Sequence, residues 1–128
     1  MTRKRSNPTS PYVPSGLIAK TEKGYFYVKG SKRFKFISDR AVKSWGLKIV
    51  HTTEIDLKKT EVCGNIGFRD GSLIRDISNQ KIFLISDNKK RHIVSPDILK
   101  QLGYLKDEIV LVSSKEAGYH AEGDKLDG

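Results

Sequence analysis

The chain contains one pattern twice. Residues 25–46 align without a gap to residues 82–103, at an offset of 57. Five of the 22 aligned positions are identical, whereas ordinary compositions give roughly one identity by chance. The identical pairs are Phe26/Phe83, Lys32/Lys89, Ser38/Ser95, Lys43/Lys100 and Gly46/Gly103. The alternative is a coincidence between two amphipathic segments. Because self-similarity at a fixed period is typical of paired supersecondary units, we interpret the pattern as a tandem repeat.

Each copy predicts a β-hairpin. The first hairpin joins strands at residues 25–28 and 33–37, and the second joins strands at residues 82–85 and 90–94. The intervening pairs, Gly30-Ser31 and Asp87-Asn88, tolerate the positive φ that a tight turn requires. Residues 33–37 alternate polar and apolar side chains, which predicts a strand with one face in water.

A short helix and further strands complete each copy. Ser38 and Ser95 are placed as helix N-caps, and Gly46 and Gly103 supply a left-handed stop. Flanking strands are expected at residues 17–20, 48–53, 73–76 and 108–113.

These elements predict a mainly β (α+β) fold with two tandem repeats of strand, β-hairpin, short helix and strand. Residues 15–69 form repeat 1, which is basic, and residues 70–114 form repeat 2, which is neutral. A repeat of this size buries little surface alone, so we expect the copies to pack together and share a core. Residues 1–14 are predicted to be an extended arm and residues 115–128 a loose polar tail.

The positive charge belongs to the first half. The net charge is +9, with 14 Lys/Arg against 5 Asp/Glu in residues 1–64 and ten against ten in residues 65–128. A negatively charged partner would therefore meet the first half. The candidate partner-binding residues of the first hairpin are Lys29, Lys32, Arg33 and Lys35. They interleave with aromatic residues, which is typical either of a nucleic-acid-binding sheet or of a half-buried hairpin with a solvated lysine face.

The N-terminal arm supplies four more candidate partner-binding residues. Arg3, Lys4 and Arg5 form a basic cluster, and Tyr12 stands between prolines. Prolines exclude a helix here, so the arm is either a disordered tail or an extended segment that lies on a neighbouring chain.

No residues combine into a predicted active site. His51, His92 and His120 lack metal-ligand spacing with one another or with Cys63. His92 is expected on the outer face of a strand, and Cys63 is expected to pack as a small hydrophobe. We predict no catalytic, cofactor-binding or metal-binding residues, and no enzyme activity. No apolar run approaches the length that crosses a membrane, and a secretory signal is not expected.

The second copy resembles a repeat of bacterial surface proteins and tailed-phage virion proteins. The residues that carry this resemblance are Asp70-Gly71-Ser72-Leu73-Ile74-Arg75, residues 82–85, residues 89–95 and Leu102-Gly103-Tyr104. It covers most of residues 70–112 and, more loosely, residues 15–53. Usual members carry glycine in the hairpin turn, where the second copy has Asn88 and the first has Gly30. The resemblance implies a non-enzymatic module associated with a cell wall, a surface or a virion.

We therefore predict a bacteriophage virion component from the head, neck or tail, assembled in the host cytoplasm. Its expected partners are other virion proteins or copies of itself, with no membrane partner. One alternative is a small basic protein that binds nucleic acid through the arm and the first hairpin. Another is a cytoplasmic protein that binds a bacterial enzyme.

Overall fold

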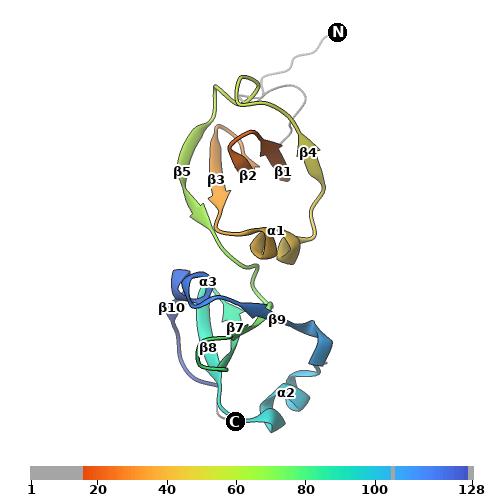
Figure 1. Cartoon of the computed structure of the whole chain (residues 1–128), viewed down its shortest axis with the longest axis vertical. Coiled ribbons are helices and arrows are strands. Elements are labelled where there is room, and N and C mark those ends of the chain that lie inside the picture. The colour runs from red at the N-terminus through yellow and green to blue at the C-terminus, as the bar shows by residue number, and fades with distance from the viewer. Residues whose placement is uncertain (1–15, 105, 127–128) are drawn as a thin grey trace. The chain divides into compact units, whose positions relative to one another are not determined.

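The structure is a computed structural model that describes residues 16–104 and 106–126. The chain divides into two compact units, Met1–Ile66 (unit 1) and Gly67–Gly128 (unit 2). Each unit contains a five-stranded mixed sheet and short helices (Figure 1). The predicted β-rich α+β fold is therefore confirmed.

Unit 1 is built around an antiparallel meander with a parallel strand added at each edge. The meander is β1 (Leu17–Thr21), β2 (Gly24–Lys29) and β3 (Lys32–Phe36). Helix α1 (Asp39–Trp45) leads to β4 (Ile49–His51), which runs parallel to β1. Strand β5 (Glu61–Ile66) runs parallel to β3, which gives the order β4-β1-β2-β3-β5.

Unit 2 repeats this topology. Its meander is β6 (Leu73–Asp76), β7 (Ile82–Ser86) and β8 (Lys89–Ile93), followed by α2 (Pro96–Leu102) and the 3₁₀ turn η1 (Lys106–Glu108). Then come β9 (Ile109–Val112), α3 (Ser114–Tyr119) and β10 (Ala121–Glu122). Read from β9, the order β9-β6-β7-β8-β10 is the order of unit 1, with β9 and β10 again parallel to their neighbours. The repeat in the sequence is thus a repeat of the fold.

Local signals explain where the helices and turns fall. The Ser38 Oγ accepts a hydrogen bond from the Ala41 N–H at 3.2 Å, which caps α1. Gly46 and Gly103 end α1 and α2 at φ values of 61° and 81°. In the second hairpin, Asp87 and Asn88 both take a positive φ, as a tight turn of this kind requires. Ser95 precedes α2 but makes no side-chain capping bond.

Each sheet buries side chains against its own covering segments. In unit 1 the ring of Tyr27 stacks on Trp45 of α1 at 5.8 Å between centroids. Successive strand residues point to opposite faces, so the neighbouring Val28 lies on the other face. There it forms a buried cluster with Ala19 and Leu57. In unit 2 a buried cluster lies on the face that carries the helix, and it contains Leu73, Ile93 and Ile98 of α2. A core shared between the copies stays a prediction.

The fifth strands differ from the sequence-based expectation. The expected strands left residues 54–72 unassigned, but β5 lies there and completes the first sheet. Residues 115–128 were expected to be a loose tail, but α3 and β10 lie there. The Ser113 side chain and Glu116 form a capping box that starts α3. Both segments are polar, and each pairs in parallel with a strand that is distant in the sequence, so the local sequence gives little indication that they form strands.

Candidate functional site

The positive charge of the first hairpin is concentrated at its tip. Lys29 and Lys32 flank the Gly30-Ser31 turn and lie directly opposite each other in the β2–β3 register. Both are exposed, and we call these two residues the tip lysines. Lys35 is also exposed, but it lies opposite Phe26, toward the other end of the hairpin. Like charges in directly opposite positions destabilise a hairpin. In unit 2 the opposed pair is Ser86 and Lys89, so the doubled charge belongs to unit 1 alone.

Arg33 follows Lys32 in β3, but its side chain is buried and ion-paired rather than exposed to a partner, and its binding role stays a prediction. Its side chain is 9% exposed and forms a two-pronged ion pair with Glu54. The Nη2–Oε1 distance is 2.7 Å, and Nη1 donates to Oε2 at 2.9 Å. The guanidinium also lies over the Phe26 ring, 4.5 Å from its centroid. At Arg33, the face of β3 that was expected in water is covered by the loop after β4.

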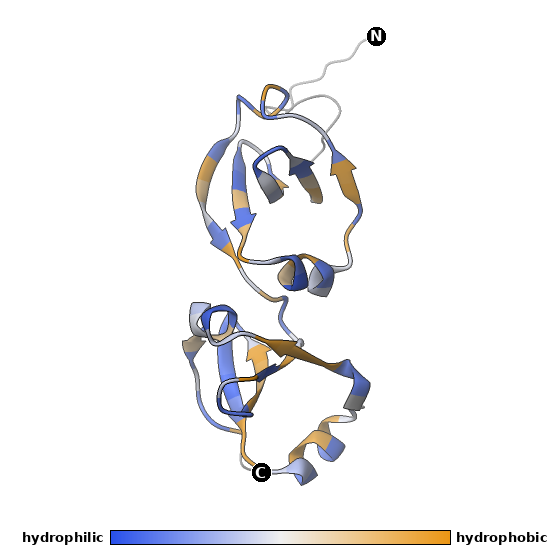
Figure 2. Cartoon of the chain, viewed as in Figure 1, coloured by the Kyte–Doolittle hydropathy of each residue, from blue (hydrophilic) through white to orange (hydrophobic). Residues whose placement is uncertain are grey.

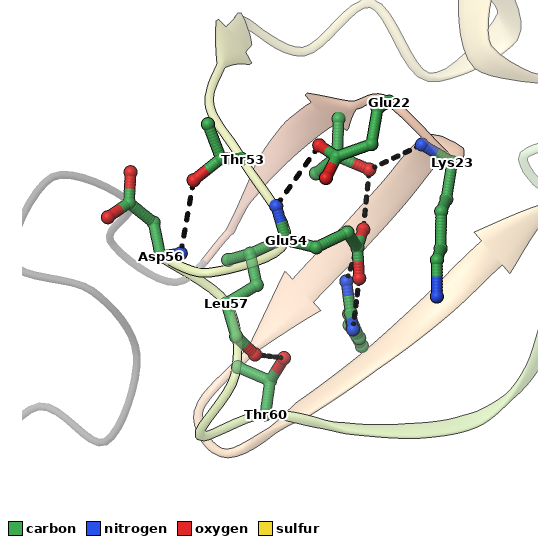
Figure 3. A network of polar contacts seen from close by, with 9 residues as sticks. Glu22, Lys23, Thr53, Glu54, Asp56, Leu57 and Thr60 are labelled. Atoms are coloured by element: carbon green, nitrogen blue, oxygen red, sulfur yellow. Dashed lines mark hydrogen bonds and ion pairs between the residues drawn. The ribbon is translucent and has the colours of Figure 1, made fainter.

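The covering loop is held by a network of polar contacts centred on Glu54 (Figure 3). The Thr21 hydroxyl donates to the same carboxylate, and the Glu54 N–H donates to Glu22 Oε1 at 3.2 Å. Hydrogen bonds from Arg33 hold the pKa of Glu54 below its ordinary value, although burial opposes this. Leu57, carried by the same loop, is fully buried. The ion pair therefore fastens the loop to the sheet.

Unit 2 uses a cation at the same position. Lys90 aligns with Arg33, and its Nζ lies 5.2 Å from the Phe83 ring centroid, as Arg33 lies over Phe26. Lys90 donates to the carbonyl of Ala117 at 3.2 Å, which ties α3 to the sheet. Sequence analysis missed this role, although the alignment of Arg33 with Lys90 was available as a signal.

The buried His120 side chain makes a second set of polar contacts in unit 2. It is 1% exposed, and its Nε2 accepts from the Phe68 N–H at 3.1 Å. Its Nδ1 lies 2.9 Å from the Asn88 carbonyl oxygen. These contacts assign the proton to Nδ1, because a carbonyl can only accept. Burial lowers the pKa of His120, so the neutral ring is favoured.

His92 and Cys63 lie in environments that differ from those expected from the sequence. The His92 ring lies half-buried, 5.6 Å from the centroid of Phe83, and not on an open outer face. Cys63 is exposed on the edge strand β5, so its expected packing as a small hydrophobe is wrong. Val62 beside it is 53% exposed, so β5 leaves apolar side chains at the surface.

Unit 2 also contains a mainly apolar pocket of about 360 Å³. We call it the unit 2 pocket. It lies where the ends of β6, β7 and β8 meet α2 and β9, and Figure 2 shows β9 as strongly hydrophobic. The residues that line the pocket include Arg75, Ile82, Val94, Leu99 and Ile109.

The remaining predicted site residues, Arg3, Lys4, Arg5 and Tyr12, lie outside the described residues. Within residues 16–104 and 106–126, no three His, Cys, Asp or Glu side chains gather as a metal would require. The helices of this same part of the chain are all too short or too polar to cross a membrane.

Comparison with known proteins adds no relative: no family model matches the chain, and no match is found among curated proteins or solved structures.

Proposed function

We propose that the chain is a non-enzymatic structural protein of a bacteriophage particle that binds neighbouring subunits or copies of itself. One observation carries the proposal. Among the described residues, the buried Arg33 and His120 and the partly buried Glu54 hold covering segments to the sheets, and the buried Asp76 and Glu116 serve a turn and a helix cap. The tip lysines and several apolar side chains, by contrast, are exposed.

Three of the exposed large apolar side chains, Ile49, Val62 and Leu111, lie on edge strands. Val62 of β5 is 53% exposed and Leu111 of β9 is 54% exposed. Each of these strands has one neighbour in its sheet, so its other edge is open for a partner. This arrangement supports contact with other proteins, and the resemblance to virion repeats supports a particle as the setting.

The test is incorporation into particles. The full chain, carrying an affinity tag, should co-purify with virions from infected bacteria rather than with host proteins from uninfected lysate. Removal of residues 1–14 should abolish incorporation while the circular dichroism spectrum stays unchanged. Normal incorporation of the shortened chain would count against a role of the arm, and recovery with host proteins alone would count against the virion setting.

A second candidate function is nucleic-acid binding, which the opposed Lys29 and Lys32 favour. Each phosphate contact releases counterions, so the affinity should fall steeply with salt, with a slope of about −0.9 per contact on a double-logarithmic plot for duplex DNA. A variant with Lys29, Lys32 and Lys35 changed to glutamine should lose roughly three such contacts. The matched control changes Lys58 and Lys59, which are exposed in the same unit, to glutamine. Binding that is absent, or equally altered by the control, would exclude this role for the hairpin.

A further inference from the structure

We propose that unit 1 binds single-stranded nucleic acid on the sheet face that packs against α1. The inference rests on the second candidate function, nucleic-acid binding, and is independent of the virion setting. It adds the form of the nucleic acid, the face of the sheet that meets it and the side chains that contact its bases.

The strand registers gather aromatic and basic side chains on this face. Tyr27 stacks on Trp45 of α1, so Tyr25 and Lys29, two residues to either side of Tyr27 in β2, also lie on the helix face. Their cross-strand partners share the face, because paired residues of neighbouring strands point to the same side. The aromatic and basic residues gathered in this way, which we call the aromatic face of unit 1, are Lys20, Tyr25, Tyr27, Lys29, Lys32, Phe34 and Trp45.

The rings of the aromatic face are placed to stack on bases. All four are half-buried, so part of each ring is open to a ligand. Tyr27 lies directly opposite Phe34 in the β2–β3 register, and its ring centroid is 5.8 Å from that of Trp45 at an interplanar angle of 27°. Every base has a π face, so neighbouring rings hold the bases of a single strand without regard to sequence. In a duplex the bases already stack on one another, so these rings favour the single strand.

Lysines lie at both ends of the row of rings. The Nζ of Lys20 is 5.3 Å from the centroid of Tyr25. The exposed Lys29 follows Tyr25 by four residues in β2, which is roughly 13 Å along a strand. Glu61, opposite Lys32, is the one acidic residue in strands β1 to β5. The strands therefore give this face three lysines against one carboxylate, which favours contact with phosphates.

Unit 2 shows what the fold alone requires at the ring positions. Aliphatic or basic side chains replace all four rings there, namely Ile82, Leu84, Arg91 and Leu102. Rings are therefore not needed to pack the sheet against the helix, so the core does not explain their presence in unit 1. Unit 2 keeps cations at Arg75 and Lys89, and its equivalent face thus offers charge without rings.

The first test compares single and double strands on the full chain. The probes are a mixed-sequence DNA strand of about 12 nucleotides, the RNA strand of the same sequence, and the DNA strand annealed to its complement. A single strand, whether DNA, RNA or both, should bind more tightly than the duplex and should quench the fluorescence of Trp45, the only tryptophan. Equal or tighter binding of the duplex would overturn the proposal while leaving the second candidate function in place. Absence of binding by all three probes would overturn both.

The second test removes rings without removing charge. Tyr25→Ile and Tyr27→Leu introduce the residues of unit 2, and each should weaken binding of a labelled single strand roughly tenfold, measured by fluorescence anisotropy. The salt dependence should stay unchanged, because no phosphate contact is lost. The matched control Tyr27→Phe keeps the ring and should bind like the parent chain, and circular dichroism checks that each variant is folded.

The carboxylate on this face gives a change of opposite sign. Glu61→Gln removes the one negative charge of these strands and should strengthen binding of the single strand. Unchanged affinity in both Tyr25→Ile and Tyr27→Leu, or an equal loss for single strand and duplex, would overturn the proposal. Duplex binding that persists in either case would still support the second candidate function.

Discussion

At the scale of single residues, both copies place a cation over a phenylalanine ring, but the hydrogen-bond acceptor of that cation differs between them. A cation lies over a phenylalanine ring in each, Arg33 over Phe26 and Lys90 over Phe83. Arg33 then pairs with a carboxylate, whereas Lys90 donates to the carbonyl of Ala117. An arginine fork matches a carboxylate with two hydrogen bonds, and an ammonium suits a single carbonyl. In each copy the cation fastens a covering segment onto the same sheet face.

Removal of the carboxylate should therefore destabilise unit 1. Glu54→Ala leaves the mostly buried Arg33 without its counter-charge, and we expect a loss of about 2–4 kcal/mol in the free energy of unfolding. Urea unfolding followed by fluorescence of Trp45, the only tryptophan, reports on this unit. The exposed Glu61 serves as control, because Glu61→Ala should change stability by less than about 0.5 kcal/mol. Equal effects of the two substitutions would contradict a fastening role for the ion pair.

The stability of unit 2 should depend on pH through His120. Burial lowers the pKa of His120 in the folded chain, so the unfolded chain takes up a proton first as the pH falls. The contribution of the neutral ring is complete above the ordinary histidine pKa of about 6.5 and is lost progressively as the pH falls below it. Amide hydrogen exchange of β8 between pH 7.5 and 5 measures this loss. His120→Asn should lower protection at pH 7.5 and flatten the pH dependence, and an unchanged pH dependence in this variant would contradict the assignment.

The sequence predicted some of these residues and missed others. Lys29, Lys32 and Lys35 are exposed, as expected. Arg33 is not, because the alternation in β3 shows that its two faces differ but not that the loop after β4 covers Arg33. The unit 2 pocket was also missed, because its lining comes from strands and a helix that are separated in the sequence.

At the scale of elements, the helix ends follow from local chemistry. Gly103 ends α2 at a φ of 81°, which favours glycine, whereas Gly118 lies within α3 without a positive φ. A Cβ atom at either position would meet nothing within 4 Å. The two glycines therefore differ in backbone conformation and not in available space.

Alanine substitutions at these two glycines should therefore change the stability of unit 2 in opposite directions. Gly103→Ala should destabilise unit 2 by about 1 kcal/mol, because alanine is strained in the left-handed conformation. Gly118→Ala should stabilise unit 2 by about 0.5–1 kcal/mol, because it restricts the unfolded chain and alanine favours a helix. Thermal unfolding followed by exchange of unit 2 amides separates the two. Effects of the same sign would contradict the assigned helix end.

The antiparallel meander and the strands that follow the helices, β4 and β9, could be predicted from the sequence, whereas the edge strands β5 and β10 could not. Turn residues such as Asp87 and Asn88 and the alternation of each strand are local signals. The pairings Lys32 with Glu61 and Lys89 with Ala121 are long-range. Lys32 and Lys89 are 57 residues apart, whereas their partners Glu61 and Ala121 are 60 residues apart. An alignment without gaps therefore cannot extend to β5 and β10.

At the scale of the whole molecule, one topology appears with two electrostatic characters. The opposed lysines at the first hairpin tip become Ser86 and Lys89 in the second. Such a difference leaves the strand order unchanged because it lies on exposed turns and not in the buried clusters. We infer that duplication allowed one copy to change its binding surface while both kept the fold.

The strand pairing of the full chain in solution tests this duplication most directly. Backbone nuclear Overhauser effects should show β4 parallel to β1 and β5 parallel to β3, and in the same spectrum β9 parallel to β6 and β10 parallel to β8. The duplication predicts all four pairings in these registers, with the Gly123 N–H protected by the Lys90 carbonyl as the Glu61 N–H is by Ser31. Edge strands that pair with different neighbours in the two units would contradict it.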